Sequence, residues 1–130
     1  MQLANVHERT FHATPDQIGA LLADLDAIWP AHITPAPRPQ GGLLDAPPML
    51  WQEFVRPGAA RAFRVVAPPG IRGEHWFEVW RVEGGAVLRH TIAGEASGEY
   101  ETIWRERIEP VHDRVLEALF DNLGSLLELH

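Results

Sequence analysis

The last third of the chain constrains the fold most, because it has the pattern of one long amphipathic helix between residues 99 and 129. In its second half, apolar residues and one histidine recur at spacings of three and four: His112, Leu116, Leu119, Phe120, Leu123, Leu126 and Leu127. Acidic residues fall on the opposite side: Asp113, Glu117, Asp121 and Glu128. A helix with one broad apolar stripe and one acidic back must lie on a large apolar surface, which the rest of the chain should supply.

A proline divides this helix into two halves. Upstream of Pro110 a second apolar stripe is rotated relative to the first, and it consists of Tyr100, Ile103, Trp104, Ile108 and Val111. Proline removes an amide donor and clashes with the preceding turn, so the sequence predicts a bend at Pro110. Such a bend would let both stripes face the same surface.

Composition narrows the range of functions. A chain of 130 residues is enough for one domain, residues 1–130. No run approaches the ~20 apolar residues that cross a membrane, so membrane insertion is not expected. Residues 1–11 carry charges and lack the apolar centre of a signal peptide, which favours a cytoplasmic location.

Charge and residue usage exclude further classes. The net charge is −7 without a basic cluster, so a nucleic-acid partner is not expected. The chain has no cysteine, and all eleven basic residues are arginine, which excludes thiolate and lysine Schiff-base chemistry. It also lacks a Ser-His-Asp spacing, a phosphate loop, a glycine-rich dinucleotide turn and an HExxH motif.

The N-terminal part predicts a strand that leads into a short helix. Residues from Leu3 to His12 have the length of a strand, and Thr14 followed by Pro15 is typical of a helix start. The helix should run through Leu25. The segment Pro30–Pro48 then carries six prolines, too many for a helix or a central strand. This loop is either a lid over a binding site or a surface connection.

The middle of the chain has the period of strands. Four runs are separated by glycine and proline turns: Met49–Arg56, Arg61–Ala67, Glu74–Val82 and Ala86–Ala93. Short connections of this kind predict an antiparallel meander. If Gly84-Gly85 is a two-residue turn, Val79 pairs with His90 and Phe77 pairs with Ile92.

This register assigns the two faces of the last hairpin. The interior face carries His75, Phe77, Val79, Arg81, Leu88, His90 and Ile92. The other face carries Trp76 and Trp80, and Arg89 is placed to cover Trp80 by a cation–π contact. Alternatively, the two tryptophans form the surface of a homodimer.

The resulting order is strand, short helix, proline-rich loop, antiparallel meander and long C-terminal helix. Together with the segments Val6–Leu25, Gly73–Val79, Leu88–His90 and Pro110–Asp113, this order resembles the START-like, or SRPBCC, superfamily, in particular its polyketide cyclase/dehydrase-like bacterial branch. The resemblance implies an α+β helix-grip fold, a curved antiparallel β-sheet wrapped around a long C-terminal α-helix with a short helix after the first strand. It also implies a cavity between sheet and helix, in which many members bind a small apolar or amphipathic molecule and some catalyse cyclisation or dehydration.

The first functional hypothesis is therefore the binding of a small hydrophobic or aromatic metabolite. It predicts a cavity of some hundreds of Å³. The expected lining residues are Phe77, Val79, His90, Ile92, Trp104, His112 and Leu116. Aromatic residues also occur about once in each element, where they fill the core or stack on a flat ligand: Trp29, Trp51, Phe54, Phe63, Phe77 and Trp104.

Two other hypotheses remain open. One is a cyclase/dehydrase-type enzyme that uses His75, His90 or His112 for proton transfer, since the ordinary pKa of histidine lies near neutrality. The alternative for each histidine is a core residue bonded to a backbone carbonyl or a carboxylate. The other hypothesis is an interaction module that uses the Trp76 and Trp80 face or the proline-rich loop.

No cofactor and no metal site are expected. In the predicted register His75 lies opposite Gly94, four residues along the strand from His90. At ~3.3 Å per residue this separation is about 13 Å, too large for both imidazoles to bind one ion. His112 lies next to Asp113, but their directions differ by about 100° on a helix, so this carboxylate is not expected to be its partner.

Overall fold

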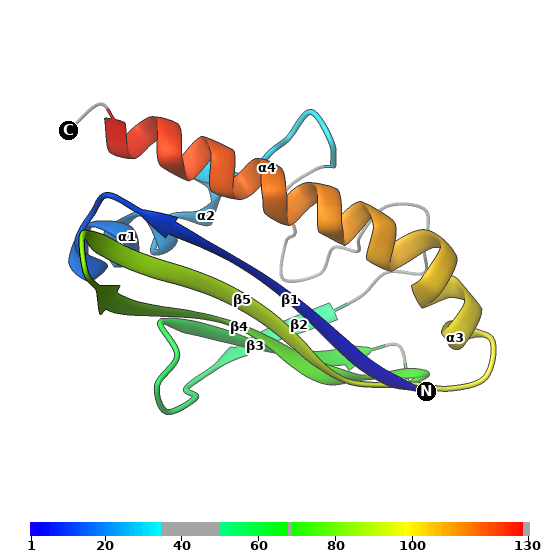
Figure 1. Cartoon of the computed structure of the whole chain (residues 1–130). Helices are drawn as coiled ribbons and strands as arrows, with labels where there is room; N and C mark the ends of the chain where they lie inside the picture. Colours follow the sequence, from blue (N-terminus) through cyan, green and yellow to red (C-terminus); the bar gives the residue numbers. More distant parts are fainter. Residues whose placement is uncertain (35–49, 68, 129–130) are drawn as a thin grey trace.

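The computed structural model describes residues 1–34, 50–67 and 69–128. A five-stranded antiparallel sheet has the strand order β1-β5-β4-β3-β2. Its strands are β1 (Gln2–Phe11), β2 (Leu50–Phe54), β3 (Arg61–Ala67), β4 (Ile71–Val82) and β5 (Gly85–Ala96). The helices are α1 (Pro15–Leu22), α2 (Leu25–Ile28), α3 (Tyr100–Ile103), the π-helix η1 (Trp104–Ile108) and α4 (Glu109–Glu128). Figure 1 shows the C-terminal helix lying along one face of the curved sheet, with α1 and α2 at one end. The predicted α+β helix-grip architecture is confirmed.

The N-terminal elements follow from local sequence signals. Thr14 caps α1 as predicted, because its hydroxyl accepts from the Gln17 amide while the Gln17 side chain accepts from the Thr14 amide. The helix ends at Leu22 rather than Leu25, and Leu25 begins the separate short helix α2. Among the described residues, no helix combines the length and the apolar character that a membrane crossing requires.

The register of the β4–β5 hairpin differs from the prediction by two residues. Val82 pairs with Gly85, so the turn is Glu83-Gly84, and Gly84 has the positive φ of 81° that such a turn favours. Phe77 therefore pairs with His90, and His75 pairs with Ile92. A shift of two residues preserves the faces, since side chains alternate with a period of two, but it changes every cross-strand neighbour.

Both hairpin strands are longer than predicted. Gly73 and Gly94, which lie just outside the predicted strands, are opposite each other inside the sheet. A Cβ atom on Gly94 would lie 2.1 Å from the Arg72 carbonyl oxygen, and one on Gly73 would lie 2.7 Å from the Ala93 oxygen. The two glycines therefore permit a close approach of two backbones within a continuous ladder.

The C-terminal helix is continuous from α3 through η1 to α4, and its irregularity precedes the proline. Pro110 has no amide hydrogen, and the π-helical turn Trp104–Ile108 lies directly before it, with the Glu109 amide bonded to the Trp104 carbonyl. Trp104 and Ile108 are buried. The buried residues of α4 are His112, Val115, Leu116, Leu119, Phe120 and Leu123. The sequence correctly predicted that both halves face the sheet. It did not predict the π-helical turn, and the bend at Pro110 stays a prediction.

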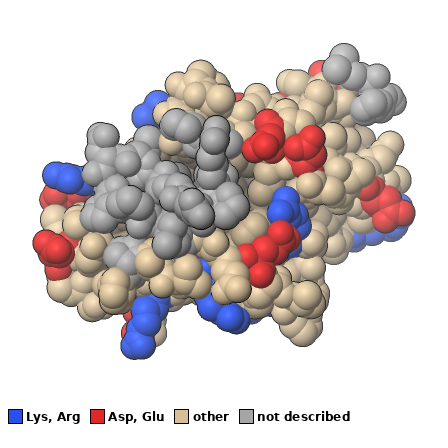
Figure 2. All heavy atoms as spheres, turned by 180° about the vertical axis from the view of Figure 1, so that it is seen from behind, with Lys and Arg blue, Asp and Glu red and all other residues tan. Residues whose placement is uncertain are grey.

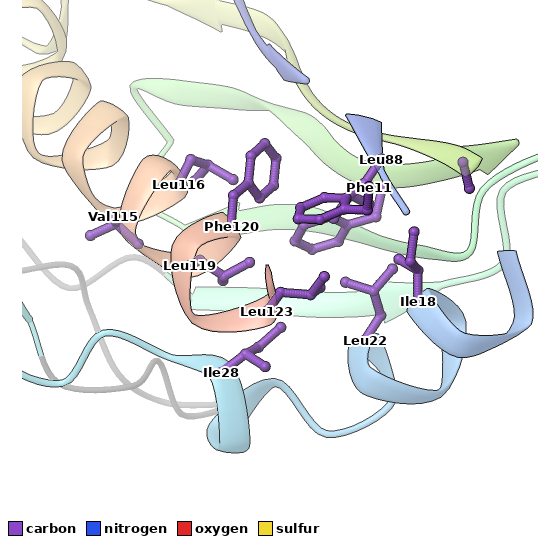
Figure 3. Close-up of a cluster of buried hydrophobic side chains, with 12 residues drawn as sticks. Phe11, Ile18, Leu22, Ile28, Leu88, Val115, Leu116, Leu119, Phe120 and Leu123 are labelled. Carbon is purple, nitrogen blue, oxygen red and sulfur yellow. The ribbon is translucent and has the colours of Figure 1, made fainter. Parts of the chain in front are cut away.

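The core has two parts along this helix. The larger one joins α1, α2, β1, β4, β5 and α4, and Figure 3 shows side chains of α4 converging with Phe11, Ile18, Leu22 and Ile28. Phe11 and Phe120 meet edge to face with ring centroids 6.3 Å apart. The smaller part lies at the other end of the sheet and consists of Leu3, Ile71, Ala96, Trp104 and Ile108.

The two tryptophans of the outer face, Trp76 and Trp80, are partly covered by side chains of the same chain. The Arg56 guanidinium lies 3.8 Å from the Trp76 ring centre, and that of Arg89 lies 4.8 Å from the Trp80 ring centre. The second contact confirms the predicted cation–π pair. This arrangement counts against the homodimer surface.

On the face in Figure 2, basic and acidic side chains are interspersed.

The proposed lid falls mostly on residues 35–49, which lie outside the described residues, so the choice between lid and connection stays a prediction. Met49, the predicted start of the second strand, lies there too.

Candidate functional site

A hollow of about 60 Å³ lies between the sheet and the C-terminal helix. Its described wall is mostly apolar and aromatic, with three histidines and Glu74: Leu3, Leu25, Trp29, Trp51, Phe63, Val65, Ile71, Gly73, Glu74, His75, Phe77, His90, Ile92, Trp104, Ile108, His112, Val115, Leu116 and Leu119. The Glu74 carboxylate is paired with Arg56 at 2.8 Å and with Arg64 at 3.6 Å. This hollow is smaller than the cavity of some hundreds of Å³ that the sequence predicted.

The structure places six of the seven predicted lining residues in this wall, and Val79 is the exception. Val79 pairs with Leu88 rather than with His90 and packs on the larger core. The corrected register explains this difference, since it moves Val79 two residues along β5 toward the turn.

A second hollow of about 480 Å³ shares four wall residues with the first. The shared residues are Leu25, Trp29, Trp51 and Phe63. The other wall residues are mostly polar: Ala23, Asp24, Asp26, Gln52, Glu53 and Arg61. Arg61 donates to both carboxylate oxygens of Glu53 at 2.9 and 2.8 Å, and this bond lowers the pKa of Glu53. We call the smaller one the inner hollow and the larger one the outer hollow.

The three histidines that were proposed as catalytic candidates form one cluster. His75 Nδ1 and His90 Nε2 are 3.3 Å apart, a hydrogen-bond distance, and the His90 and His112 ring centres are 5.2 Å apart. The sequence-based distance of about 13 Å between His75 and His90 was therefore wrong. It followed from the shifted register, and the exclusion of a shared ion that rested on it no longer holds.

These imidazoles are buried and only partly hydrogen-bonded. Burial, reinforced by the charge of His112, lowers the pKa of His75 to about 3, and burial lowers that of His112 to about 4. Burial also lowers the pKa of His90, with a contribution from His112. All three rings are therefore neutral at pH 7. Within the described part of the chain, His75 Nε2, His90 Nδ1 and both ring nitrogens of His112 have no hydrogen-bond partner.

The aromatic wall is organised around His75. Its ring stacks on Phe63 at 5.1 Å between centres, and Trp51 meets it edge-on at 4.3 Å. The buried indole Nε1 of Trp51 also has no partner among the described residues. The site thus offers flat aromatic surfaces together with a few buried polar atoms that can donate to or accept from a ligand.

The sequence reading missed a polar ladder on β1. Alternation places Asn5, His7 and Arg9 on the face of β1 that faces α4, where each contacts two acidic side chains. The ladder consists of Asn5 with Glu109 and Asp113, His7 with Asp113 and Glu117, and Arg9 with Glu117 and Asp121. The acidic row that the sequence assigned to the back of the helix therefore lies in part against the edge strand. The alternation of polar residues in β1 was the available signal.

His112 and its neighbour Asp113 approach each other more closely than the sequence predicted, at a distance longer than a hydrogen bond. His112 Nδ1 and Asp113 Oδ1 are 3.9 Å apart. Partial burial would raise the pKa of Asp113, but hydrogen bonds from Asn5 and His7 outweigh it and lower this pKa. His112 therefore lies between two groups, with the neutral pair His75 and His90 on one side and the ladder on the other.

Comparisons with known proteins identify structures with a similar fold. No family model matches the chain, and no curated protein matches it in sequence. Among solved structures, the chain is similar to the Zhui aromatase/cyclase of Streptomyces sp. R1128 at 18% identity, with a TM-score of 0.61 over 98% of this chain and 94% of that one. A norcoclaurine synthase mutant from Thalictrum flavum, in complex with a transition-state analogue, matches at 12% identity and a TM-score of 0.66 over 100% and 96%.

A START superfamily protein from Mycobacterium smegmatis matches at 13% identity, with a TM-score of 0.55 over 98% and 97% of the two chains. At these identities the likeness concerns the fold. The protein has the helix-grip fold that these solved structures share, in agreement with the resemblance seen in its sequence.

Proposed function

We propose that the chain binds a small, flat and mainly apolar molecule between the sheet and the C-terminal helix, with one polar group of the ligand directed at the histidine cluster. The observation that carries the proposal is the wall of the inner hollow, in which buried imidazole nitrogens without partners lie among aromatic and aliphatic side chains. An unpaired buried polar group costs about 1–3 kcal/mol, so a ligand that supplies the missing hydrogen bonds recovers this energy on binding.

The volumes favour a ligand that occupies both hollows. The inner hollow of 60 Å³ is smaller than the roughly 150 Å³ apolar cavity that accommodates benzene. The outer hollow of 480 Å³ falls within the roughly 300–1,000 Å³ of ordinary ligand sites. The polar group of the ligand then reaches the histidines of the inner hollow, its aromatic part lies beside Trp51 and Phe63, and the rest of it extends into the outer hollow.

The expected contact residues are the six predicted residues that lie in the wall of the inner hollow, Phe77, His90, Ile92, Trp104, His112 and Leu116. We add three further wall residues to this set because their rings contact one another there: Trp51, Phe63 and His75. Val79 no longer belongs to the set.

Binding is tested with 2-naphthol, a flat probe with one hydroxyl group, by calorimetry and by quenching of tryptophan fluorescence. Val65 and Val66 provide a matched pair on β3, because Val65 lines the inner hollow whereas Val66 is 52% exposed. Val65→Trp should weaken binding at least tenfold by filling the hollow, and Val66→Trp should bind like the parent. Equal affinities of the two variants would refute the location of the site, and so would the absence of saturable binding.

A cyclase/dehydrase-type enzyme is the second candidate, and the histidine cluster favours it. The similar Streptomyces protein is described as an aromatase/cyclase, a reaction class that could use these residues. Neutral imidazoles can accept a proton or orient a hydroxyl group, but the lowered pKa values of His75 and His112 leave almost no general acid at pH 7. Alanine at His75, His90 or His112 should then lower kcat toward a validated substrate, and unchanged turnover in all three variants would eliminate this candidate.

A further inference from the structure

We propose that His7, His112 and Asp113 form a binding site for a divalent transition-metal ion such as Zn²⁺, which joins the edge strand β1 to α4. One ligand atom from each residue lies within 4.8 Å of the other two. The sequence predicted no metal site, because it considered His75 and His90 of the hairpin with His112 of the helix, placed no carboxylate beside them and left His7 out.

The distances fit tetrahedral coordination after small side-chain movements. Bonds of about 2.1 Å at tetrahedral angles separate neighbouring ligand atoms by about 3.4 Å. Asp113 Oδ1 lies 2.8 Å from His7 Nε2 and 3.9 Å from His112 Nδ1. These two distances fall on either side of the required value, and the ligand atoms of His7 and His112 lie within 4.8 Å of each other.

His112 provides an independent observation in favour of a ligand. Its side chain is only 8% exposed, and both of its ring nitrogens lack a hydrogen-bond partner among the described residues. Buried polar nitrogens are nearly always satisfied in folded proteins. Coordination through Nδ1 would satisfy one of them, and the other remains available to the inner hollow.

His7 is held in the orientation that a metal ligand needs. Its Nδ1 lies 2.7 Å from Glu117 Oε2, and Arg9 holds the other oxygen of this carboxylate at 3.0 Å. A ligating histidine commonly donates its second ring N–H to a carboxylate, which fixes the ring and its tautomer. The other ring nitrogen, Nε2, lies 2.8 Å from Asp113 Oδ1, so it faces the second protein ligand of the proposed site.

The carboxylate ligand is supported in the same way. Asn5 Nδ2 donates to Asp113 Oδ1 at 2.8 Å, and its own Oδ1 is buried without a partner within the described part of the chain. Asp113 is 45% exposed, so the site has a route for the ion and room for water as the fourth ligand. Two imidazoles and one carboxylate favour zinc and its neighbours in the first transition row over magnesium or calcium.

The test is a titration of the full chain, freed of metal with EDTA, with Zn²⁺ by calorimetry and with Co²⁺ by absorption spectroscopy. We expect one equivalent to bind, with the intense visible bands of tetrahedral Co²⁺ and a higher Tm in the presence of Zn²⁺. Asp113→Asn and His7→Ala should each weaken Zn²⁺ binding more than about 100-fold, and Glu117→Gln should weaken it about 10- to 100-fold while the Co²⁺ bands persist.

Two controls separate this site from adventitious binding to histidines. Asp121→Asn changes a carboxylate of the same ladder that is outside the three ligands, and His32→Ala removes an exposed histidine elsewhere. Both should bind Zn²⁺ like the parent. Asp113→Asn is surface-exposed and retains a side-chain oxygen, so it tests the site even if His7→Ala fails to fold. Unchanged Zn²⁺ affinity in Asp113→Asn, or a loss of affinity in His32→Ala equal to that in His7→Ala, would overturn the proposal.

Discussion

Mild acid should destabilise this protein through its buried histidines, at a pH where its carboxylates are still ionised. Burial lowers the pKa of His75 to about 3 and that of His112 to about 4, whereas both are 6.5 in the unfolded chain. Below pH 6.5 the unfolded chain therefore binds protons that the folded chain does not. The free energy of unfolding then falls as the pH falls, until the folded pKa of each group is reached.

The size of the effect follows from these values. Each group contributes about 1.4 kcal/mol per pH unit, so between pH 6.5 and pH 5 each histidine removes about 2 kcal/mol of stability. His75 and His112 together remove about 4 kcal/mol, and the lowered pKa of His90 acts in the same direction. The total stability of a domain is only about 5–15 kcal/mol. Glu53 and Glu117, whose pKa values are lowered by hydrogen bonds from Arg61 and His7, lose their contribution only below about pH 4.5.

The assay is urea unfolding in EDTA, followed by tryptophan fluorescence at pH 7.5, 6.5, 5.5 and 5.0, with His112→Leu as the test variant. At pH 7.5 this variant should be more stable by about 1–3 kcal/mol, because it removes two unpartnered buried nitrogens and breaks no hydrogen bond. With an unfolding entropy of roughly 0.27 kcal/mol/K for 130 residues, the gain is about 4–11 °C in Tm. At pH 5 its advantage should grow by about 2 kcal/mol.

The exposed His32 serves as the control, since His32→Ala should follow the parent at every pH. If the parent is equally stable at pH 7.5 and pH 5, the buried histidines do not have the proposed pKa values. If the parent and His112→Leu lose the same stability between these pH values, His112 is not one of the groups responsible.

Three further outcomes are expected. Gly94→Ala should lower the free energy of unfolding by at least about 2 kcal/mol, because its Cβ would lie 2.1 Å from a backbone oxygen. Gly19→Ala, in a helix with no neighbour within 4 Å, should raise it by about 0.5–1 kcal/mol. Urea midpoints that rank the two variants in the opposite order would contradict the close approach of the strands at Gly94. Arg9→Ala should cost about 1 kcal/mol in low salt and less in 1 M NaCl, since its ion pairs are exposed, and a salt-independent loss would point to packing on Phe120 instead. Thr14→Ala should cost about 1 kcal/mol by thermal unfolding, and an unchanged Tm would show that the capping box does not stabilise α1.

Patterns within one element were sufficient to predict much of this fold. The spacing of Leu116, Leu119, Phe120 and Leu123 predicted the helix and its buried face, and the pair Thr14 and Pro15 predicted the start of α1. These signals are local, because the helical period and the cap depend on residues within a few positions of one another. Six of the seven expected lining residues lie in the inner hollow for the same reason.

Relations between elements were harder to predict. Glu83-Gly84 and Gly84-Gly85 are both acceptable hairpin turns, and the choice between them moves each neighbour by two residues. The faces survive this change, but the distance between His75 and His90 does not. Likewise, no local pattern indicates that His7 contacts residues of a helix more than 100 positions away. The small volume of the inner hollow could not be predicted either, because it depends on how the side chains of several elements pack.

The ladder between β1 and α4 repeats with nearly the same step on both elements. Two residues of a strand advance about 6.6–6.8 Å, and four residues of a helix advance about 6.0 Å. Because acidic residues follow one another every four positions from Glu109 to Asp121, a slide of the helix by one turn would offer most of the β1 side chains another carboxylate. The ladder therefore restrains the rotation of the helix about its axis but discriminates poorly between successive turns. The position of the helix along its axis is fixed instead by the packing of apolar side chains of unequal shape. The contact between the rings of Phe120 and Phe11 is the main example.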